Sequence, residues 1–187
     1  MKIAKDLRLV IPVETEQGQA YVHAQAVSRE VYEHYCPVFL RAFTQIMKHA
    51  GDITGAPKVA ATYIRRAAEQ MGIKDDVESG LMAEITRLAN VAVLGVSGWE
   101  MVSLDDVHKK GMIDDDDWSE VENTLAFFTL GFFMVKKIER ELILTEVAGI
   151  WGGRITSSSF TEFKDSLPTS TATGSSGESP AASSPPH

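Results

Sequence analysis

Hydrophobic residues recur every three or four positions through most of the chain, a spacing that predicts amphipathic helices. The first such run begins after Ser28, a typical N-cap residue, and closes at Gly51. Pro37 interrupts it and would either kink one helix or start a second, because proline lacks an amide and clashes with the preceding turn. Further helices are predicted from Pro57 to Gly72, from Glu78 to Val93 and from Ser103 to Lys110.

The longest helix is predicted from about Asp115 to Val147. Four aspartates, Asp114 to Asp117, stand at its start, where free amides and the helix dipole stabilise negative charge. The middle of this run is apolar on every side, so it must be covered on every side. We therefore expect either a central core helix or a helix that forms part of an interface, with Phe128 and Phe132 as candidate partner-binding residues.

Two short runs near the N-terminus are extended in pattern. Leu7–Val13 and Ala20–Ala26 flank a glycine-containing turn, which predicts a β-hairpin. Pro12 cannot donate a ladder hydrogen bond, so its strand is expected at a sheet edge. The predicted fold class is mainly α: a compact helical domain over residues 1–153 with a short N-terminal β-hairpin.

The pattern changes after Gly153. Residues 154–167 are predicted to be an extended segment with isolated apolar side chains, Phe160, Phe163 and Leu167. These side chains either fold back onto the domain or form a short linear motif that a partner captures. Of the last 20 residues, 18 are Ser, Thr, Pro, Ala or Gly, so residues 168–187 are predicted to be a disordered tail that cannot bury enough apolar surface to order itself.

Charge and composition narrow the function classes. The net charge of −8 disfavours binding to nucleic acid, because phosphate backbones repel an acidic surface. The N-terminus lacks the apolar stretch of a signal peptide. The longest apolar run, Leu125 to Val135, is shorter than the roughly 20 residues that span a bilayer. We expect a cytosolic protein that has no membrane segment and no disulfide within its chain, since Cys36 is its one cysteine.

The sequence shows no arrangement typical of a catalytic, metal or cofactor site. The aspartate run has no calcium-loop spacing, and no histidine pair has the spacing of a helical zinc site. We expect surface or capping roles for the histidines, core or inter-helix contacts for the tryptophans, and a buried, unreactive Cys36. We predict that the protein is not an enzyme and uses no cofactor.

Several stretches, taken in order, match one pattern: Ile11–Val13, Val22–Val31, Gly55–Ala61, Ser79–Asn90, Gly98–Glu100, Glu120–Asn123, Phe127–Thr129 and Thr156–Ser170. In their order and spacing they resemble the tail assembly chaperones of long-tailed, siphovirus-like bacteriophages. No single stretch carries chemistry, so the set as a whole carries the resemblance, which covers most of the predicted domain.

The resemblance implies a small α-helical protein that coats the tape-measure protein, keeps it soluble and helps to recruit tail-tube subunits. Such a protein self-associates, acts in the host cytoplasm and is not expected in the mature virion. Many members are made in a short form and a frameshifted long form, and this chain looks like a short form because it ends in a Ser/Thr/Pro-rich tail.

Two other classes stay open. The chain could be a structural virion protein, such as a head–tail joining or tail-completion subunit, which would be found in purified particles. It could also be a small helix-turn-helix DNA-binding regulator, although the net charge of −8 argues against that class.

Overall fold

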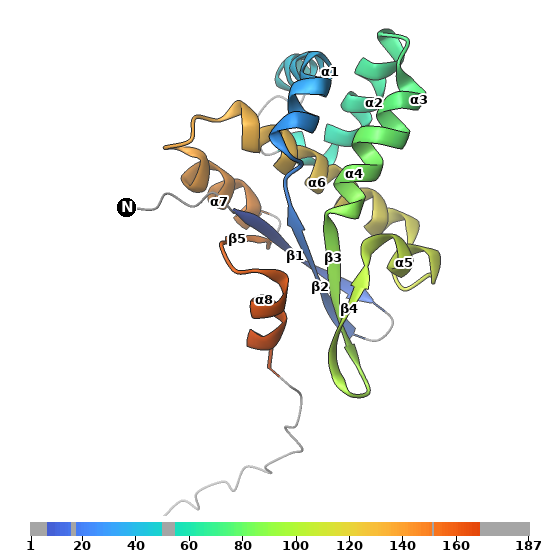
Figure 1. The fold of residues 1–187 in the computed structure, drawn as a ribbon, viewed down its shortest axis with the longest axis vertical. Coiled ribbons are helices and arrows are strands. Elements are labelled where there is room, and N and C mark those ends of the chain that lie inside the picture. The colour runs from blue at the N-terminus through green and yellow to red at the C-terminus, as the bar shows by residue number, and fades with distance from the viewer. Residues whose placement is uncertain (1–6, 16–17, 50–54, 151, 169–187) are drawn as a thin grey trace, which may run out of the picture.

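A five-stranded antiparallel sheet and a group of helices at one end of it make up the computed structural model, which describes residues 7–15, 18–49, 55–150 and 152–168 (Figure 1). The strand order is β4-β3-β2-β1-β5, and every neighbouring pair is antiparallel. The strands are β1 (Arg8–Thr15), β2 (Gly18–Gln25), β3 (Ala89–Gly95), β4 (Gly98–Ser103) and β5 (Arg154–Thr156).

This sheet shows that the prediction of a mainly α fold was wrong: the fold is α+β. The end of the helix predicted from Glu78 to Val93 is strand β3, whose alternate residues Ala89, Val91 and Val93 are buried. A two-residue turn then joins β3 to β4, and Gly98 follows it with φ +111°, which favours glycine. The short apolar run fits both a helical and an alternating pattern, and its pairing with β2 and β4 selects the strand.

The predicted N-terminal hairpin is confirmed, with Val10 opposite His23 and Pro12 opposite Tyr21. The expected edge position of its first strand holds only in part. Strand β5 pairs with the beginning of β1, from Arg8 to Val10, and Pro12 lies beyond that paired stretch. The missing amide of Pro12 therefore falls where β5 no longer needs a donor.

Helix α1 runs unbroken through Pro37, and the predicted cap is confirmed, because the Val31 amide donates to the Ser28 hydroxyl over 3.2 Å. The predicted end of this run at Gly51 lies outside the described residues. The helical elements are α1 (Arg29–His49), η1 (Ala56–Lys58), α2 (Ala60–Gln70), α3 (Lys74–Asp76), η2 (Val77–Met82), α4 (Ala83–Arg87), α5 (Leu104–Lys109), α6 (Asp115–Met134), α7 (Arg140–Ile150) and α8 (Phe160–Ser166).

Helix α6 is the central helix of the core. Its predicted start is confirmed, since the Asp117 amide donates to the Asp114 carboxylate over 2.8 Å. It is shorter than predicted: it ends at Met134, and after a turn the chain returns as α7, which packs against it. Helix α2, the turn η1, helix α7 and strand β1 all contact α6. The apolar middle of α6 is thus covered within one chain.

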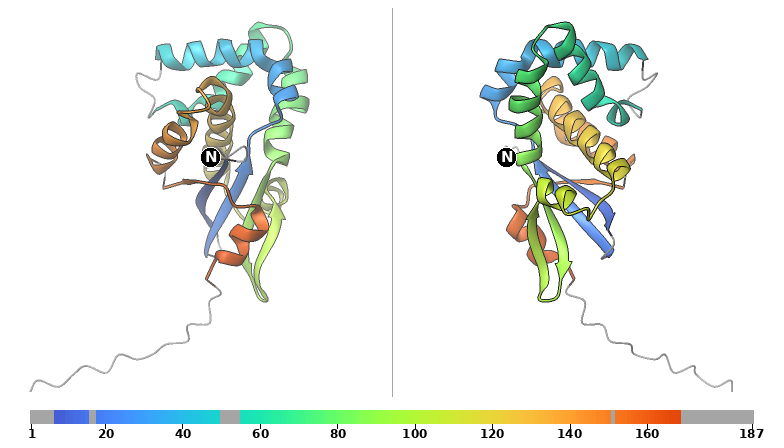
Figure 2. Two further views of the ribbon diagram at one scale, coloured as in Figure 1. Left: turned by 60° about the vertical axis from the view of Figure 1, so that its left-hand side comes forward. Right: turned by 90° about the vertical axis from the view of Figure 1, so that its right-hand side faces the viewer.

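The two faces of the sheet meet different partners. Leu9, Val22 and Val91 belong to the large core that includes α6, whereas Val10 and Ala92 face a second, smaller cluster with α8. Helices α6 and α8 accordingly lie on opposite faces of the sheet (Figure 2). Residues 154–167, predicted to be extended, therefore contain a strand and a helix, and the predicted tail beyond Pro168 lies outside the described residues.

Candidate partner-binding surfaces

Two of the candidate residues beyond the last predicted helix are buried where α8 packs on the sheet. Phe163 and Leu167 form a cluster with Val10 and Ala92. Half-buried aromatic side chains surround it: Tyr21, Trp99 and Phe160. We call this set of contacts the α8 contact. It confirms the interpretation that Phe163 and Leu167 fold back onto the domain, so neither side chain is available to a partner while α8 stays on the sheet.

The sequence contains the local signals that build α8. Ser159 and Glu162 form a capping box, in which the Glu162 amide donates to the Ser159 hydroxyl and the Ser159 amide donates to the Glu162 carboxylate. The hydrogen bond from the Ser159 backbone, and then that from its hydroxyl, hold the pKa of Glu162 below its ordinary value. Phe160, Phe163 and Leu167 follow at helical spacing, so this S-x-x-E signal could have predicted the helix.

His23 lies under α8 and is fully buried, so the expected surface or capping role is wrong for this histidine. Its ring meets that of Phe160 edge to face and stacks on that of Phe163, with centroids 5.4 Å and 5.5 Å away. Its Nε2 is 3.1 Å from the Ser158 carbonyl oxygen, which makes Nε2 the protonated nitrogen of the neutral ring. Burial lowers the pKa of His23, and the nearby Arg8 acts in the same direction.

Two more interactions hold the C-terminal end of the described chain to the sheet. The Trp99 indole donates to the Pro168 carbonyl over 3.0 Å, and the Arg154 guanidinium lies 5.2 Å from the centre of the Phe163 ring. Trp99, predicted as a core or inter-helix residue, is half-buried on strand β4 and contacts the chain just after α8. Trp118 makes an inter-helix contact, as predicted, because it stacks on His108 at 4.2 Å, whereas Trp151 lies outside the described residues.

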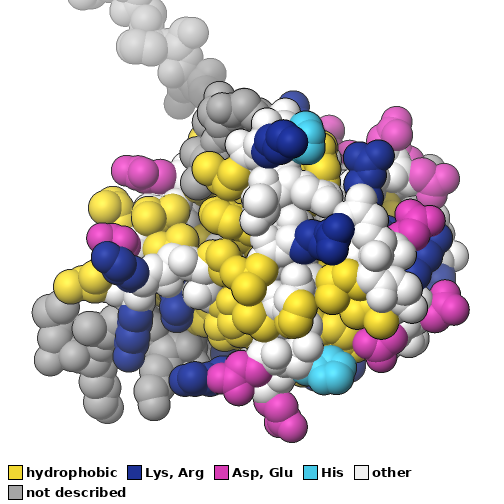
Figure 3. All heavy atoms as spheres, turned by 90° about the horizontal axis from the view of Figure 1, so that it is seen from above, with side chains coloured by type: hydrophobic (Ala, Val, Ile, Leu, Met, Phe, Trp, Pro, Cys, Tyr) yellow, Lys and Arg dark blue, Asp and Glu magenta, His cyan; other side chains and the backbone are white. Residues whose placement is uncertain are grey.

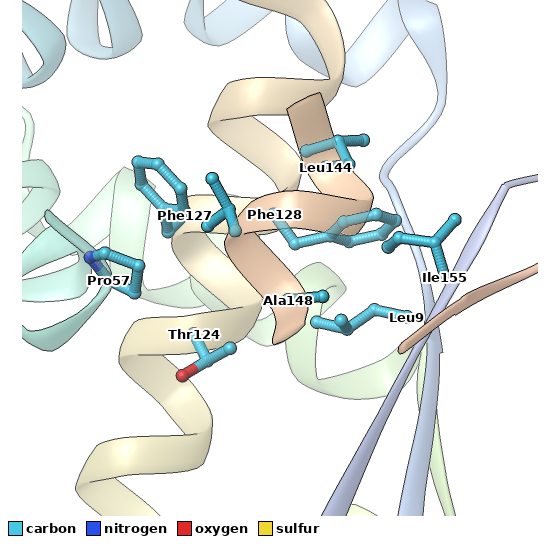
Figure 4. A pocket seen from close by; sticks show the side chains of 9 residues that line it. Leu9, Pro57, Thr124, Phe127, Phe128, Leu144, Ala148 and Ile155 are labelled. Atoms are coloured by element: carbon cyan, nitrogen blue, oxygen red, sulfur yellow. The ribbon is translucent and has the colours of Figure 1, made fainter. Parts of the chain in front are cut away.

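Phe128 is a core residue. It points from α6 toward Leu9 and Ile155, while Leu144 and Ala148 of α7 pack beside it (Figure 4). The void among these side chains is about 10 Å³, which is at the lower limit for a single water molecule. The packing leaves no room for a partner side chain, so Phe128 supports the fold and is not accessible for binding.

Phe132, one turn further along α6, is only half-buried. Together with Phe133 it lines a cleft of about 240 Å³ between the end of α6 and the first residues of β1 and α1. The guanidinium of Arg140 lies 4.2 Å from the centre of the Phe132 ring. Of the candidates named from the sequence, Phe132 is the aromatic residue that the structure places at a cleft.

Large apolar side chains are also exposed where the helices gather. Along α1, Leu40 and Met47 are exposed, and Phe43 is half-buried and packs in part against the core. On and just before α7, Ile138 is 82% exposed and Leu142 is 64% exposed. We call these five residues the helical-end surface. From above, hydrophobic side chains form a broken band across this end of the molecule (Figure 3).

This surface was not named as a site from the sequence, although its spacing is visible there. Tyr32, Cys36, Leu40, Phe43 and Met47 recur every three or four positions and form a second stripe beside the buried one. Cys36 is half-buried in this stripe, with Sγ 4.0 Å from the Tyr32 hydroxyl, so its predicted full burial is only partly met. The apolar face of α1 is therefore wider than the part of the helix that packs on the domain core.

A second cleft, of about 310 Å³, lies between the end of β1 and the start of α6 and is acidic. Glu14, Asp117 and Glu120 line it. Burial, followed by the charges of Asp114 and Glu120, raises the pKa of Asp117. Within the described part of the chain, no three His, Cys, Asp or Glu side chains are grouped closely enough to hold a metal ion.

Comparisons of the chain with family models, curated proteins and solved structures find no match. Among the described residues, no helix is both long and apolar enough to cross a membrane. The helical-end surface, the clefts and the sequence resemblance are therefore the features that bear on function.

Proposed function

We propose that this protein is a phage tail assembly chaperone that coats and solubilises the tape-measure protein and helps to recruit tail-tube subunits. The observation that carries the proposal is the helical-end surface: an acidic chain of net charge −8 exposes Leu40, Met47, Ile138 and Leu142 at the end where its helices gather. The ordered resemblance to the chaperone family agrees with it.

The physical argument concerns the client. A long helical protein that awaits assembly exposes apolar faces, and such faces aggregate if they are left in water. A partner that offers apolar side chains on one end can cover a client face, because burial of apolar area from both sides is favourable. The net charge on the rest of the chaperone keeps the complex soluble.

Co-expression with the tape-measure protein of the same phage tests the proposal. The soluble yield of the tape-measure protein should rise, the two proteins should co-purify, and moderate salt should not separate them because the contact is largely apolar. The double variant Leu40→Glu/Leu142→Glu should lose this effect. Val96→Glu/Met101→Glu is the matched control, since it adds the same two charges at exposed apolar positions in the turn before strand β4 and on that strand.

If both variants solubilise and bind the tape-measure protein equally well, the client contact does not lie on the helical-end surface. A wild-type protein that neither binds nor solubilises the tape-measure protein, and that remains in purified virions, would refute the chaperone proposal in favour of a head–tail joining or tail-completion subunit.

The proposal includes self-association and action in the host cytoplasm before the virion is complete. Light scattering should detect species larger than the 20.5 kDa chain as concentration increases. A monomer at all concentrations, with and without the client, would contradict a mechanism in which several copies coat one tape-measure protein.

A further inference from the structure

The cleft beside Phe132 differs in charge from the rest of this acidic protein. The described residues that line it include two arginines and no carboxylate: Leu7, Arg8, Gln25, Ala26, Val27, Arg29, Phe132 and Phe133. Arg140 adds a third cation, because it lies over the ring of Phe132. The cleft therefore combines an apolar, aromatic wall with three guanidinium groups.

Two of these guanidinium groups, those of Arg8 and Arg140, have a nitrogen with no hydrogen-bond acceptor among the described residues. The Nε of Arg8 is buried with no hydrogen-bond partner in the described part of the chain, and its Nη1 donates to the neutral Gln25 amide over 3.1 Å. The Nε of Arg140 likewise has no described partner, and burial lowers the pKa of this arginine. Neither guanidinium forms an ion pair with a described carboxylate, so a partner carboxylate that bonded to its outer nitrogens would add a charged hydrogen bond that the free protein lacks.

The third arginine is paired at the rim. Arg29 Nε lies 2.6 Å from the carboxylate of Glu33, and both side chains are largely exposed. An exposed ion pair of this kind contributes little to stability, so Arg29 can exchange Glu33 for another carboxylate. Glu33 is thus a carboxylate that bonds to a cleft residue, and Glu162 lies close enough to Arg8 for the Arg8 charge to help lower the pKa of Glu162; neither carboxylate belongs to the lining.

The size of the cleft indicates what fits. At about 240 Å³ it is smaller than the roughly 300–1,000 Å³ of small-molecule pockets. A single large side chain from a partner fits this space better than a cofactor. The cleft also adjoins α1, since Phe133 stacks on Tyr32 at 4.2 Å and the Tyr32 hydroxyl lies 3.5 Å from the Met134 sulfur.

We infer that this cleft is a docking site for an acidic, apolar segment of the client, in which a large hydrophobic side chain enters against Phe132 and Phe133 while neighbouring Asp or Glu side chains pair with Arg8 and Arg140. The inference rests on the proposed chaperone function for the identity of the client, but the chemistry of the cleft selects the segment. Charge complementarity then sets which part of a long helical client is held, and the apolar contact supplies affinity.

Fluorescence anisotropy with synthetic peptides tests the site directly. The probe is a labelled 18-residue helical peptide with a Leu face flanked by Glu, and its matched control carries Gln in place of every Glu. The Glu peptide should bind at least about tenfold more tightly, because hydrogen bonds between charged groups are the strong ones. Arg8→Gln/Arg140→Gln should remove that preference, whereas Arg66→Gln, an exposed change on α2, should preserve it.

Equal binding of the two peptides, or an unchanged preference in the double variant with its fold intact by circular dichroism, would overturn the inference. A Glu preference that appears only after residues 1–6 are deleted would overturn it too, because the cleft would then belong to the chain's own N-terminus. If the tape-measure protein co-purifies equally with wild type and with the double variant, the docking site fails while the proposed function stands. If the Glu peptide binds as expected and the tape-measure protein does not, the proposed function fails and the site stands.

Discussion

Among the glycines whose surroundings the structure describes, Gly80 is the one where an added methyl group would meet the closest neighbouring atom. It lies in η2, and a Cβ atom built there would be 2.0 Å from the Tyr35 hydroxyl and 3.1 Å from Cζ of the same ring. The hydroxyl is held in place, since it donates to the Asp76 carbonyl over 3.2 Å. Gly80→Ala must therefore displace the Tyr35 ring and break its hydrogen bond.

Two destabilising effects and one stabilising effect set the expected change in the free energy of unfolding. Overpacking of a fitted site costs about 1–3 kcal/mol. Loss of the Tyr35 hydrogen bond costs about 1 kcal/mol. Replacement of glycine by alanine within a helix returns about 1 kcal/mol. Gly80→Ala should thus lower the free energy of unfolding by about 1–3 kcal/mol.

Tyr35→Phe supplies the control, because it removes the hydroxyl that the methyl group would strike. This change alone should cost about 1 kcal/mol. In its background, Gly80→Ala should be nearly neutral, which leaves a coupling of about 2 kcal/mol between the two sites. Urea denaturation of the four proteins, followed by far-UV circular dichroism, measures this cycle. An equal cost of Gly80→Ala in both backgrounds would refute the close approach of helix and ring.

Three further outcomes are expected. Phe128→Ala should lower the free energy of unfolding by about 3–5 kcal/mol in urea denaturation, and a loss below 1 kcal/mol would contradict its place in the core. Phe163 is equally buried at 3%, but Phe163→Ala should act locally: amides of residues 154–168 should exchange faster in mass spectrometry while those of α6 keep their protection, and exposure of α6 would argue against a separate α8 contact. Because the pKa of His23 is lowered from 6.5, the unfolded chain takes up this proton first, so stability should fall as pH drops from 6.5 toward the lowered value; His23→Gln should flatten that slope, and an unchanged slope would assign it to other groups.

Signals that act over a few residues could be predicted from the sequence. The side chains of Ser28 and Asp114 each accept a hydrogen bond from an amide at a predicted helix start, and Ser103 does the same at the start of α5, because capping needs only the cap and the next turn. The N-terminal hairpin was also predicted, since its two strands are adjacent in sequence and β-branched residues are concentrated in the first of them.

Features that depend on distant partners were missed. The run from Ala89 to Val93 fits two periodicities, and its pairing with β2, far away in sequence, selects the strand. His23 lies on the face of β2 that points away from the main core, so the local pattern predicts an exposed side chain. Helix α8, far away in sequence, covers this face and buries the ring. The break after Met134 likewise depends on α7 folding back, with Leu144 packed 3.2 Å from the position a Gly131 Cβ would take.

The fold leaves a different surface available for self-association from the one that the sequence indicated. The apolar surplus of α6 suggested an interface from the sequence, but α7 and β1 cover that helix within the chain, so Phe128 can no longer motivate an oligomer. The surface available for contact is instead the helical-end surface on α1 and around α7. If copies associate through this surface, they compete with the client for it, and Leu40→Glu/Leu142→Glu should weaken both interactions together. If the variant loses the client and still self-associates in light scattering, the two contacts use different faces, and several copies can coat one client without giving up the surface that holds it.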